Sequence, residues 1–471
     1  MSRTRRINGP GKIGVSTLGG ERIPRKPFTK EMKKEYTILI PIMAPIHFAI
    51  IRNILMNAGY RAELLENNSP AVVEEGLKYV HNDTCYPALL VIGQMIDALK
   101  SGKYDVNKTA VLMSQTGGGC RASNYIFLLR RALKKAGFEQ VPVVSFNVSG
   151  LEKNSGFRLT PPLVYRLLAG LVYGDGLMAL NNQIKPYEKV RGGSASLVND
   201  WIARLTGQFS RSRGFSTREM KRNFSAMTAE FHAIPCERSP KVKVGIVGEI
   251  YVKYASLGNN NLEEFLASQD CEVMVPGLLD FMLYTLDGMA ENNRLYGGGA
   301  AGARVREAIG RYIERMQDVM IDSIAAYPEF TEPSRFSHTR SLAEDVIGAG
   351  CQMGEGWLLT AEMVELVEKG YGNIVCTQPF GCLPNHICGK GMIRKIRERE
   401  PGANIVPIDY DPSATRVNQE NRIKLMLAVA RENMDNNQGT NRKQKPDATK
   451  RKHPDKNDPY QKWWSWLPSH A

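Results

Sequence analysis

The sequence lacks the long apolar run that a membrane span needs. Its longest apolar stretches, near residues 40 and 90, contain proline or polar residues and fall short of the roughly 20 residues of a spanning helix. The arginines near the N-terminus are not followed by an apolar segment, so they do not resemble a secretory signal. We therefore expect no membrane segment and a cytoplasmic protein.

Several short motifs are also missing. There is no CxxC pair, which disfavours a structural zinc site. The Gly-rich turn in TGGGCRAS follows a predicted strand, but it lacks the lysine of GxxxxGK[ST] and the spacing of GxGxxG, so the case for phosphate binding there is weak but stays open. The chain has eight cysteines, and in a large cytoplasmic protein these are more often buried thiols, metal ligands or catalytic groups than disulfides.

The net charge of +14 is concentrated at the two ends of the chain. Residues 1–35 carry +7 and residues 436–471 carry +5, which leaves about +2 for the 400 residues between them. The core is therefore close to neutral. Basic ends can touch RNA or an anionic surface, but no RNA-binding motif accompanies them, so nucleic acid is an unfavoured partner and solvated, disordered ends are expected.

With 471 residues the chain is long enough for two or three cores. From residue 37 to 150, short β-rich runs alternate with amphipathic helical stretches, which predicts a parallel sheet covered by helices. Expected strands are 37–42, 62–65, 109–114 and 141–146, and expected helices are 46–58, 72–80, 88–99 and 122–136. The fold class predicted is α/β.

The pattern changes to helical spacing between residues 151 and 240 and alternates again after that. We expect two Rossmann-like parallel-sheet domains with a helical connector. The predicted parts are a basic N-terminal arm (1–36), a first α/β domain (37–150), the connector (151–240), a second α/β domain (241–434) and a basic disordered tail (435–471). In the second domain, helices are expected at 261–268, 356–368 and 386–399, and strands at 241–247, 271–275, 373–377 and 404–408.

Three cysteines share one predicted local setting. Cys85, in HNDTCYPA, stands immediately before a helix with Pro87 in its first turn. Cys120, in QTGGGCRASNY, follows a buried strand and a turn of three glycines, and a helix begins after it. Cys382, in PFGCLPNHICGKGM, also follows a strand and a glycine and precedes a helix. Each thiol is thus expected at the start of a helix.

This setting favours thiolate chemistry. A helix start offers unpaired N–H groups and the positive end of the macrodipole, which lower the pKa of a thiol. The carboxyl ends of parallel strands are also where ligands bind in α/β sheets. Gly117, Gly118, Gly119 and Gly381 would let the backbone approach a bound cofactor. We therefore predict that Cys85, Cys120 and Cys382 form a metal or thiolate site, with buried inert thiols as the alternative.

The remaining cysteines are weaker candidates. Cys376 lies in the strand that leads to Cys382 and is included as a candidate fourth ligand. Cys351 also precedes a helix, Cys388 is expected in a helix core, and Cys236 and Cys271 are expected to be structural. Among the acids, Glu249 and Glu355 lie beside the motifs, where a glutamate is more often a helix cap than a catalyst.

Five motifs together resemble a known protein family. They are HNDTCYPA, QTGGGCRASNY, GEIYVKY with LGNNNLEEF, GEGWLLTAEM, and PFGCLPNHICGKGM. From about residue 37 to 433 the chain resembles a stand-alone version of the C-terminal module of the acyl-CoA dehydratase activase-related proteins. It is more distantly similar to the 2-hydroxyacyl-CoA dehydratase subunits and to the double-cubane cluster proteins.

The resemblance implies a [4Fe–4S] or related iron–sulfur cluster on three cysteines, which here would be Cys85, Cys120 and Cys382. It implies that a separate ATP-dependent activator delivers low-potential electrons for dehydration or reduction of an acyl-CoA or similar substrate, in a homo- or hetero-oligomer. The activator's own phosphate-binding motif is absent, so this chain is not expected to hydrolyse ATP alone.

Two other functions stay open at this point. One is a non-catalytic, nucleotide-dependent activase partner or assembly scaffold that uses the turn at Gly117–Gly119. The other is an RNA-associated protein that acts through its basic ends. The aromatic segment Trp463–Trp466 in the tail could dock on a partner or on the protein's own surface.

Overall fold

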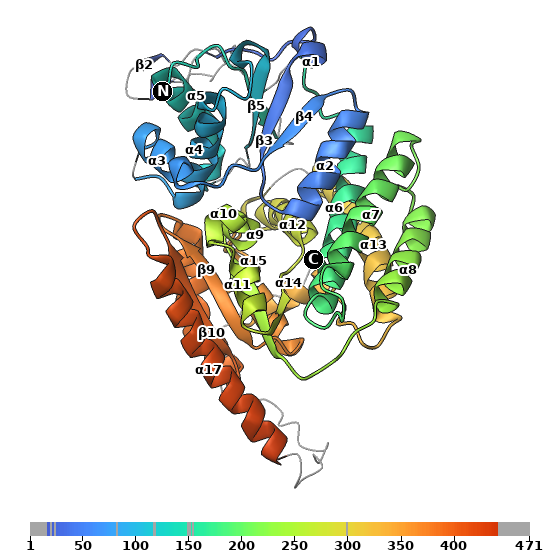
Figure 1. The fold of residues 1–471 in the computed structure, drawn as a ribbon. Helices are drawn as coiled ribbons and strands as arrows, with labels where there is room; N and C mark the ends of the chain where they lie inside the picture. Colours follow the sequence, from blue (N-terminus) through green and yellow to red (C-terminus); the bar gives the residue numbers. More distant parts are fainter. Residues whose placement is uncertain are drawn as a thin grey trace, which may run out of the picture.

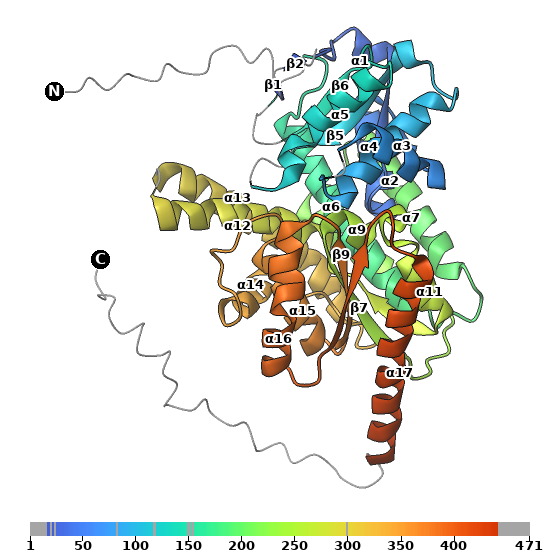
Figure 2. The same cartoon turned by 90° about the vertical axis from the view of Figure 1, so that its left-hand side faces the viewer.

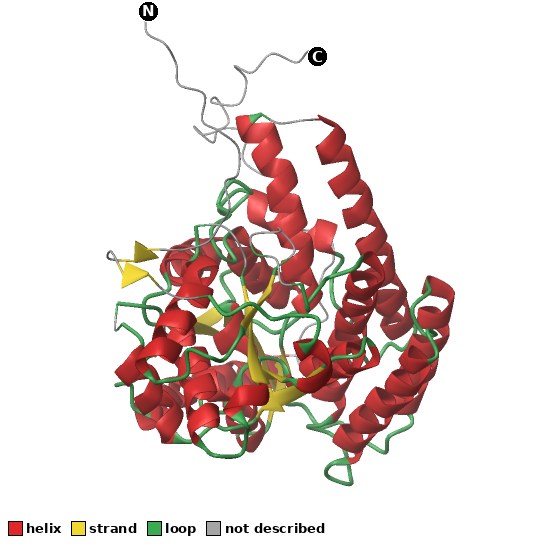
Figure 3. Ribbon diagram, turned by 90° about the horizontal axis from the view of Figure 1, so that it is seen from above, coloured by secondary structure: helices red, strands yellow, loops and turns green. Residues whose placement is uncertain are grey.

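The computed structural model describes residues 17–18, 21–22, 25–81, 83–115, 119–147, 152, 155–297 and 300–440. Within them the chain forms two four-stranded sheets whose strands are all parallel (Figure 1). Both sheets are flanked by helices, as in Rossmann-like domains, and Figure 3 shows the strands in the interior with helices around them. The predicted α/β fold with two parallel sheets is confirmed.

The first sheet has the order β4-β3-β5-β6. Its strands are β3 (Thr37–Pro41), β4 (Arg61–Leu65), β5 (Thr109–Ser114) and β6 (Val143–Phe146). Most residues of the two central strands, β3 and β5, are apolar and buried, as expected for strands covered on both faces. The helices of this part are α1 (Met32–Glu35), α2 (Pro45–Asn57), α3 (Pro70–Tyr79), α4 (Tyr86–Lys100) and α5 (Tyr125–Lys135), with 3₁₀ turns η1 (Val106–Lys108) and η2 (Arg121–Asn124).

The second sheet repeats this order as β8-β7-β9-β10. Its strands are β7 (Val242–Gly248), β8 (Cys271–Met274), β9 (Asn373–Pro379) and β10 (Asn404–Tyr410). The helices that follow its strands are α9 (Ile250–Tyr254), α10 (Ser256–Asn259), α11 (Leu262–Ser268), α15 (Trp357–Glu368), α16 (Ile393–Arg399) and α17 (Arg416–Thr440), with the short turns η3 (Asn385–Gly389) and η4 (Lys390–Met392). In both sheets the chain order reverses beside the first strand, and that reversal is where α/β proteins bind ligands.

Long helices complete the molecule. They are α6 (Pro161–Ile184), α7 (Gly193–Ser210), α8 (Thr217–His232), α12 (Leu278–Tyr296), α13 (Ala300–Ala325) and α14 (Phe336–Glu344). Figure 2 shows α12 and α13 side by side, extending away from the body of the protein. A two-strand antiparallel ladder, β1 (Thr17–Leu18) with β2 (Glu21–Arg22), precedes the first domain.

Helix α6 is long and mostly apolar. In the part of the chain that the structure describes, it is the one helix long and apolar enough to cross a membrane, yet 72% of its apolar stretch is buried inside the fold. It packs against α2, α8, α12 and α13. A helix that is apolar on all sides and surrounded by other helices is a core helix, so α6 is the centre of the helical region.

Three details differ from the predicted elements. Part of the predicted N-terminal arm packs on the first domain, because Phe28 is fully buried and its carbonyl accepts a hydrogen bond from the Gly156 N–H. The single helix expected at 386–399 is divided into η3, η4 and α16, where Gly389 approaches the Cys376 thiol too closely for a side chain to fit easily. The predicted disordered tail, 435–471, begins within α17, which continues to Thr440, and residues from 441 on, with Trp463–Trp466, lie outside the described residues.

Candidate functional site

The turns that carry Cys85 and Cys382 are in direct contact, although they belong to different domains. The Tyr86 N–H, at the start of α4, donates a 3.0 Å hydrogen bond to the carbonyl of Phe380, in the turn after β9. A side chain at Gly381 would come within 3.1 Å of the Cys85 Cα. The absence of a side chain at residue 381 therefore allows the two turns to meet.

The Cys120 turn faces the same region. Gly119 lies against the side chain of Met353, and the Cys85 thiol is close enough to Cys120 and to Cys382 to raise the pKa of both. The structure thus brings together segments that follow β5 in the first sheet and β9 in the second. Gly117 and Gly118, which were predicted to assist here, lie outside the described residues.

Cys120 caps η2, and its thiol accepts a hydrogen bond from the Ala122 N–H at 3.5 Å. Cys85 is the N-cap residue of α4 but makes no side-chain cap hydrogen bond there. The backbone N–H groups of Ala88 and Asn385 act to lower the pKa of Cys85 and of Cys382, respectively, against the effect of burial. The predicted position of Cys85 and Cys120 at helix starts is confirmed. Such donors stabilise a thiolate or a thiolate-bound ligand.

Two buried glutamates, Glu249 and Glu355, complete this region. Glu249 follows β7 and is the N-cap of α9, where its carboxylate accepts from the Val252 N–H at 2.9 Å. Glu355 accepts from the Ile250 N–H at 2.8 Å. Both therefore act as helix caps, yet burial raises the pKa of Glu249 to about 8, with a further contribution from Glu355.

Without a bound cation, the thiols hold their protons. Burial raises the pKa of Cys120 to about 12, and the carboxyls of Glu355 and Glu249 add to the effect. Burial also raises the pKa of Cys382, again with help from the same two glutamates, and that of Cys85. In a site of this kind, metal binding releases the thiol protons, and the thiolates become the ligands.

The hydroxyl of Tyr125 is a further member that the sequence analysis did not single out. Its oxygen lies 2.8 Å from the Cys85 Sγ, and the ring is almost fully buried at the start of α5. The only sequence signal was its position five residues after Cys120, near the start of the predicted helix 122–136. Glu249 and Glu355 had a clearer signal, since each follows a glycine in one of the five motifs.

The structure does not bring Cys376 to the three turns. Its thiol is fully buried on β9 and packs against Asn385 and Gly389 beneath η3. Cys351 and Cys388 instead face each other, with 3.3 Å between their sulfurs. Cys271 is buried at the start of β8, and the half-buried Cys236 pairs with Glu188 in an isolated β-bridge.

Large apolar side chains are exposed in the segments around Cys382. Between 51% and 61% of their surface is accessible, which is unusual for a cluster of such residues on a surface with no partner. They are Met353, Phe380, Leu383 and Ile387, which we call the apolar rim.

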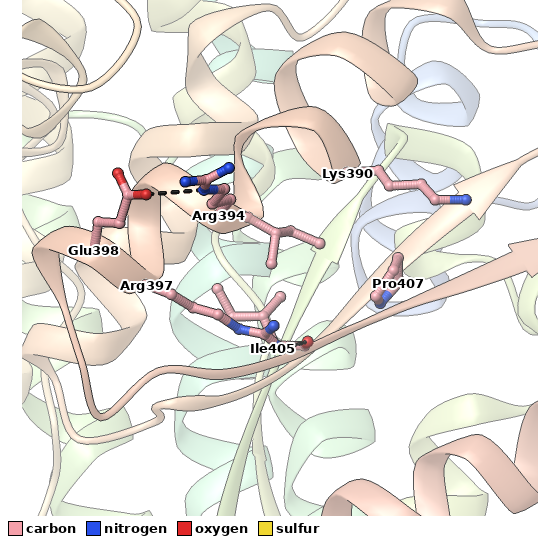
Figure 4. Close-up of a pocket in the computed structure, with 7 residues that line it drawn as sticks. Lys390, Arg394, Arg397, Glu398, Ile405 and Pro407 are labelled. Atoms are coloured by element: carbon pink, nitrogen blue, oxygen red, sulfur yellow. Dashed lines mark hydrogen bonds and ion pairs between the residues drawn. The ribbon is translucent and has the colours of Figure 1, made fainter.

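Two hollows lie elsewhere on the protein. A groove of about 540 Å³ between α16 and β10 is lined by Lys390, Ile393, Arg394, Arg397, Glu398, Ile405 and Pro407 (Figure 4). Its arginines already have partners, since Arg394 pairs with Glu398 at 2.9 Å and Arg397 donates to the Ile405 carbonyl at 2.6 Å. A smaller pocket of about 290 Å³ lies between α2, α6 and the α10–α11 segment. Neither hollow is lined by a cysteine.

No group of three or more His, Cys, Asp or Glu side chains within the described residues is arranged to hold a single metal ion. Thiolates that hold an iron–sulfur cluster each bind a different iron, so they are spaced more widely than the ligands of one ion. No model of a known protein family matches the chain, and no curated protein matches it.

Proposed function

We propose that this chain is an iron–sulfur protein of the 2-hydroxyacyl-CoA dehydratase type. In this proposal Cys85, Cys120 and Cys382 hold a [4Fe–4S] or related cluster between the two sheets. The cluster supplies one-electron chemistry at low potential, which permits dehydration or reduction of an acyl-CoA or similar substrate. The observation that carries the proposal is the direct contact between the Cys85 and Cys382 turns, with Cys120 near enough for the Cys85 thiol to raise its pKa.

The donor set fits such a group in its chemistry. Thiolates are the usual ligands of iron–sulfur clusters, and hydrogen bonds to sulfur adjust the cluster's potential. The Cys120 thiol accepts from the Ala122 N–H at 3.5 Å, and the Cys85 thiol lies 2.8 Å from the Tyr125 hydroxyl. Burial of Cys85 and Cys382, which are 5% and 7% exposed, would exclude water from most of the site.

The two glutamates have separate roles from the thiols. Glu249 and Glu355 are buried next to one another with raised pKa values, so at neutral pH the pair retains a proton. A buried carboxyl that keeps its proton near pH 7 can donate it to a bound substrate. We assign this proton to the Glu249–Glu355 pair.

The partners follow from the surface around the site. The apolar rim supports docking of another protein beside Cys382, which in this proposal is the ATP-dependent activator or a second subunit. The chain has no Walker-type phosphate loop of its own. In this proposal the activator therefore hydrolyses the ATP and supplies the electrons. The cytoplasm, where thiols stay reduced, is the proposed location.

The proposal is tested by purifying the full chain under anaerobic conditions and measuring iron, acid-labile sulfide and the visible absorption spectrum. The wild-type protein should be brown and contain both elements. Cys120→Ser and Cys382→Ser should each lower iron and sulfide severalfold, because each removes one ligand.

The matched control is Cys236→Ser, which alters a half-buried cysteine beside Glu188 rather than at the site. Its iron and sulfide content should equal that of the wild type. A colourless protein without iron, obtained from anaerobic cells and after attempted reconstitution, would disprove the proposal. Equal loss in all three variants would disprove the ligand assignment.

A further inference from the structure

Cys351 and Cys388 form a close pair of thiols beside the proposed cluster site. Their sulfurs are 3.3 Å apart, which is less than the roughly 3.5–4.0 Å at which non-bonded heavy atoms pack. Both are free cysteines in this structure. A disulfide requires the sulfurs to approach to about 2.05 Å, so they would have to move about 1.2 Å closer.

The backbone on each side of the pair is held in place. The carbonyl of Cys351 accepts from the Trp357 N–H at 2.8 Å, and the carbonyl of Cys388 accepts from the Thr360 hydroxyl at 2.6 Å. Both donors lie in the first turns of α15. Because the same helix fixes both cysteines, their proximity is a consequence of the packed core and not of a loose loop.

The two thiols differ in access. Cys351 is partly exposed, whereas Cys388 is 2% exposed. A reagent from solvent can therefore reach Cys351 first, and the buried Cys388 sulfur is in contact with the Cys351 sulfur. This is the arrangement of an attacking thiol and a resolving thiol.

We propose that Cys351 and Cys388 are a redox-active dithiol that a low-molecular-weight disulfide converts reversibly to an internal disulfide. The Cys351 thiolate attacks one sulfur of the reagent, forms a mixed disulfide and releases one thiol. Cys388 then attacks the Cys351 sulfur, which breaks the mixed disulfide and releases the second thiol. The two cysteines lose two electrons and two protons, and the reagent is reduced to two thiols.

The bond would join two segments that line the proposed cluster site. Cys351 begins the loop that carries Glu355. Cys388 lies in η3, six residues after Cys382 and next to Ile387 of the apolar rim. Oxidation would therefore lock the Glu355 loop to the Cys382 turn. The proposal goes beyond the cluster assignment and does not depend on it.

The test uses full-length protein, reduced and purified anaerobically, then incubated with oxidised glutathione. Remaining thiols are alkylated, and the peptides are analysed without reduction. Two alkylatable thiols should be lost, and fragment spectra should show Cys351 joined to Cys388. A reducing thiol should restore both. In Cys388→Ser, Cys351 should retain one glutathionyl group, because the resolving thiol is absent.

Cys236→Ser is the control, and the Cys351–Cys388 link should form in it as in the wild type. If Cys388→Ser does not fold, the wild-type fragment spectra and Cys351→Ser, which should form no link, still decide the question. The proposal is overturned if both cysteines stay alkylatable while Cys236 is glutathionylated, or if the link joins Cys382 or Cys376 instead. Iron content is measured in parallel, so iron-free protein that still forms the link would refute only the cluster.

Discussion

The contact between the Cys85 and Cys382 turns depends on a single glycine. Gly381 has φ +74°, and a side chain there would lie 3.1 Å from the Cys85 Cα and 3.3 Å from the Thr84 carbonyl oxygen. These neighbours are backbone atoms, so they cannot move aside as the end of a flexible side chain would. Gly381→Ala should separate the two turns and lower the iron content of the anaerobic protein.

Gly370→Ala provides a matched control for this substitution. Gly370 is also exposed and has φ +85°, but no atom lies within 4 Å of the position that a Cβ would take there. The free energy of unfolding of Gly370→Ala should fall by only about 1 kcal/mol, because of left-handed backbone strain. That of Gly381→Ala should fall by about 1–3 kcal/mol more, because of steric overlap. Equal thermal stability and equal iron in the two variants would show that the close approach does not matter.

Among the helices, a buried ion pair joins α9 to α15. Lys253 Nζ lies 2.9 and 3.2 Å from the two carboxylate oxygens of Glu362, and both side chains are at most 6% exposed. Burial raises the pKa of Glu362 to about 7, although Lys253 opposes the shift. The ion pair thereby fixes α9, which Glu249 caps, to α15, which follows Glu355.

Lys253→Met should destabilise the protein by about 3–5 kcal/mol, because it leaves the Glu362 carboxylate buried without its cation. The double variant Lys253→Met/Glu362→Leu should recover most of that loss, since an apolar pair of similar volume is tolerated in a buried position. Denaturant unfolding of the three proteins measures both effects. A double variant as unstable as the single one would contradict this explanation.

For the protein as a whole, buried carboxyls should make stability depend on pH. Burial raises the pKa of Asp280 well above its ordinary value, and the nearby Glu365 and Asp175 raise it further. Asp280 lies in the first turn of α12, where the helix dipole favours a carboxylate by about 0.3–1 kcal/mol. That is less than the several kcal/mol that burial of a charge costs.

The direction of the pH effect follows from proton binding. Above about pH 4 the unfolded chain has released the Asp280 proton, whereas the folded protein still holds it, so stability falls as pH rises by up to about 1.4 kcal/mol per unit for such a group. We expect a lower melting temperature at pH 8 than at pH 5.5. Asp280→Asn keeps the oxygen that accepts from Gln317 at 2.6 Å and should reduce the difference between the melting temperatures at pH 5.5 and pH 8. If that difference is unchanged in the variant, Asp280 is not its source.

The strands, most helices and the placement of two cysteines at helix starts follow from the order of the amino acids alone. The apolar runs of β3, β5, β7 and β9 are short and β-branched, and proline stands in the first turns of α2, α3, α4 and α6. These are local signals, because they depend on residues a few positions apart. They predicted the two parallel sheets without reference to any distant contact.

Which side chains meet depends instead on how the folded chain packs. Sequence position could not show that Cys376, six residues before Cys382, lies beneath η3, or that Cys351 and Cys388 face each other at 3.3 Å. It also could not show that Glu249 and Glu355, 106 residues apart in the chain, cap the same helix. Such pairs form because two domains fold separately and then pack, and a packed contact depends on shape across the whole chain rather than on any local pattern.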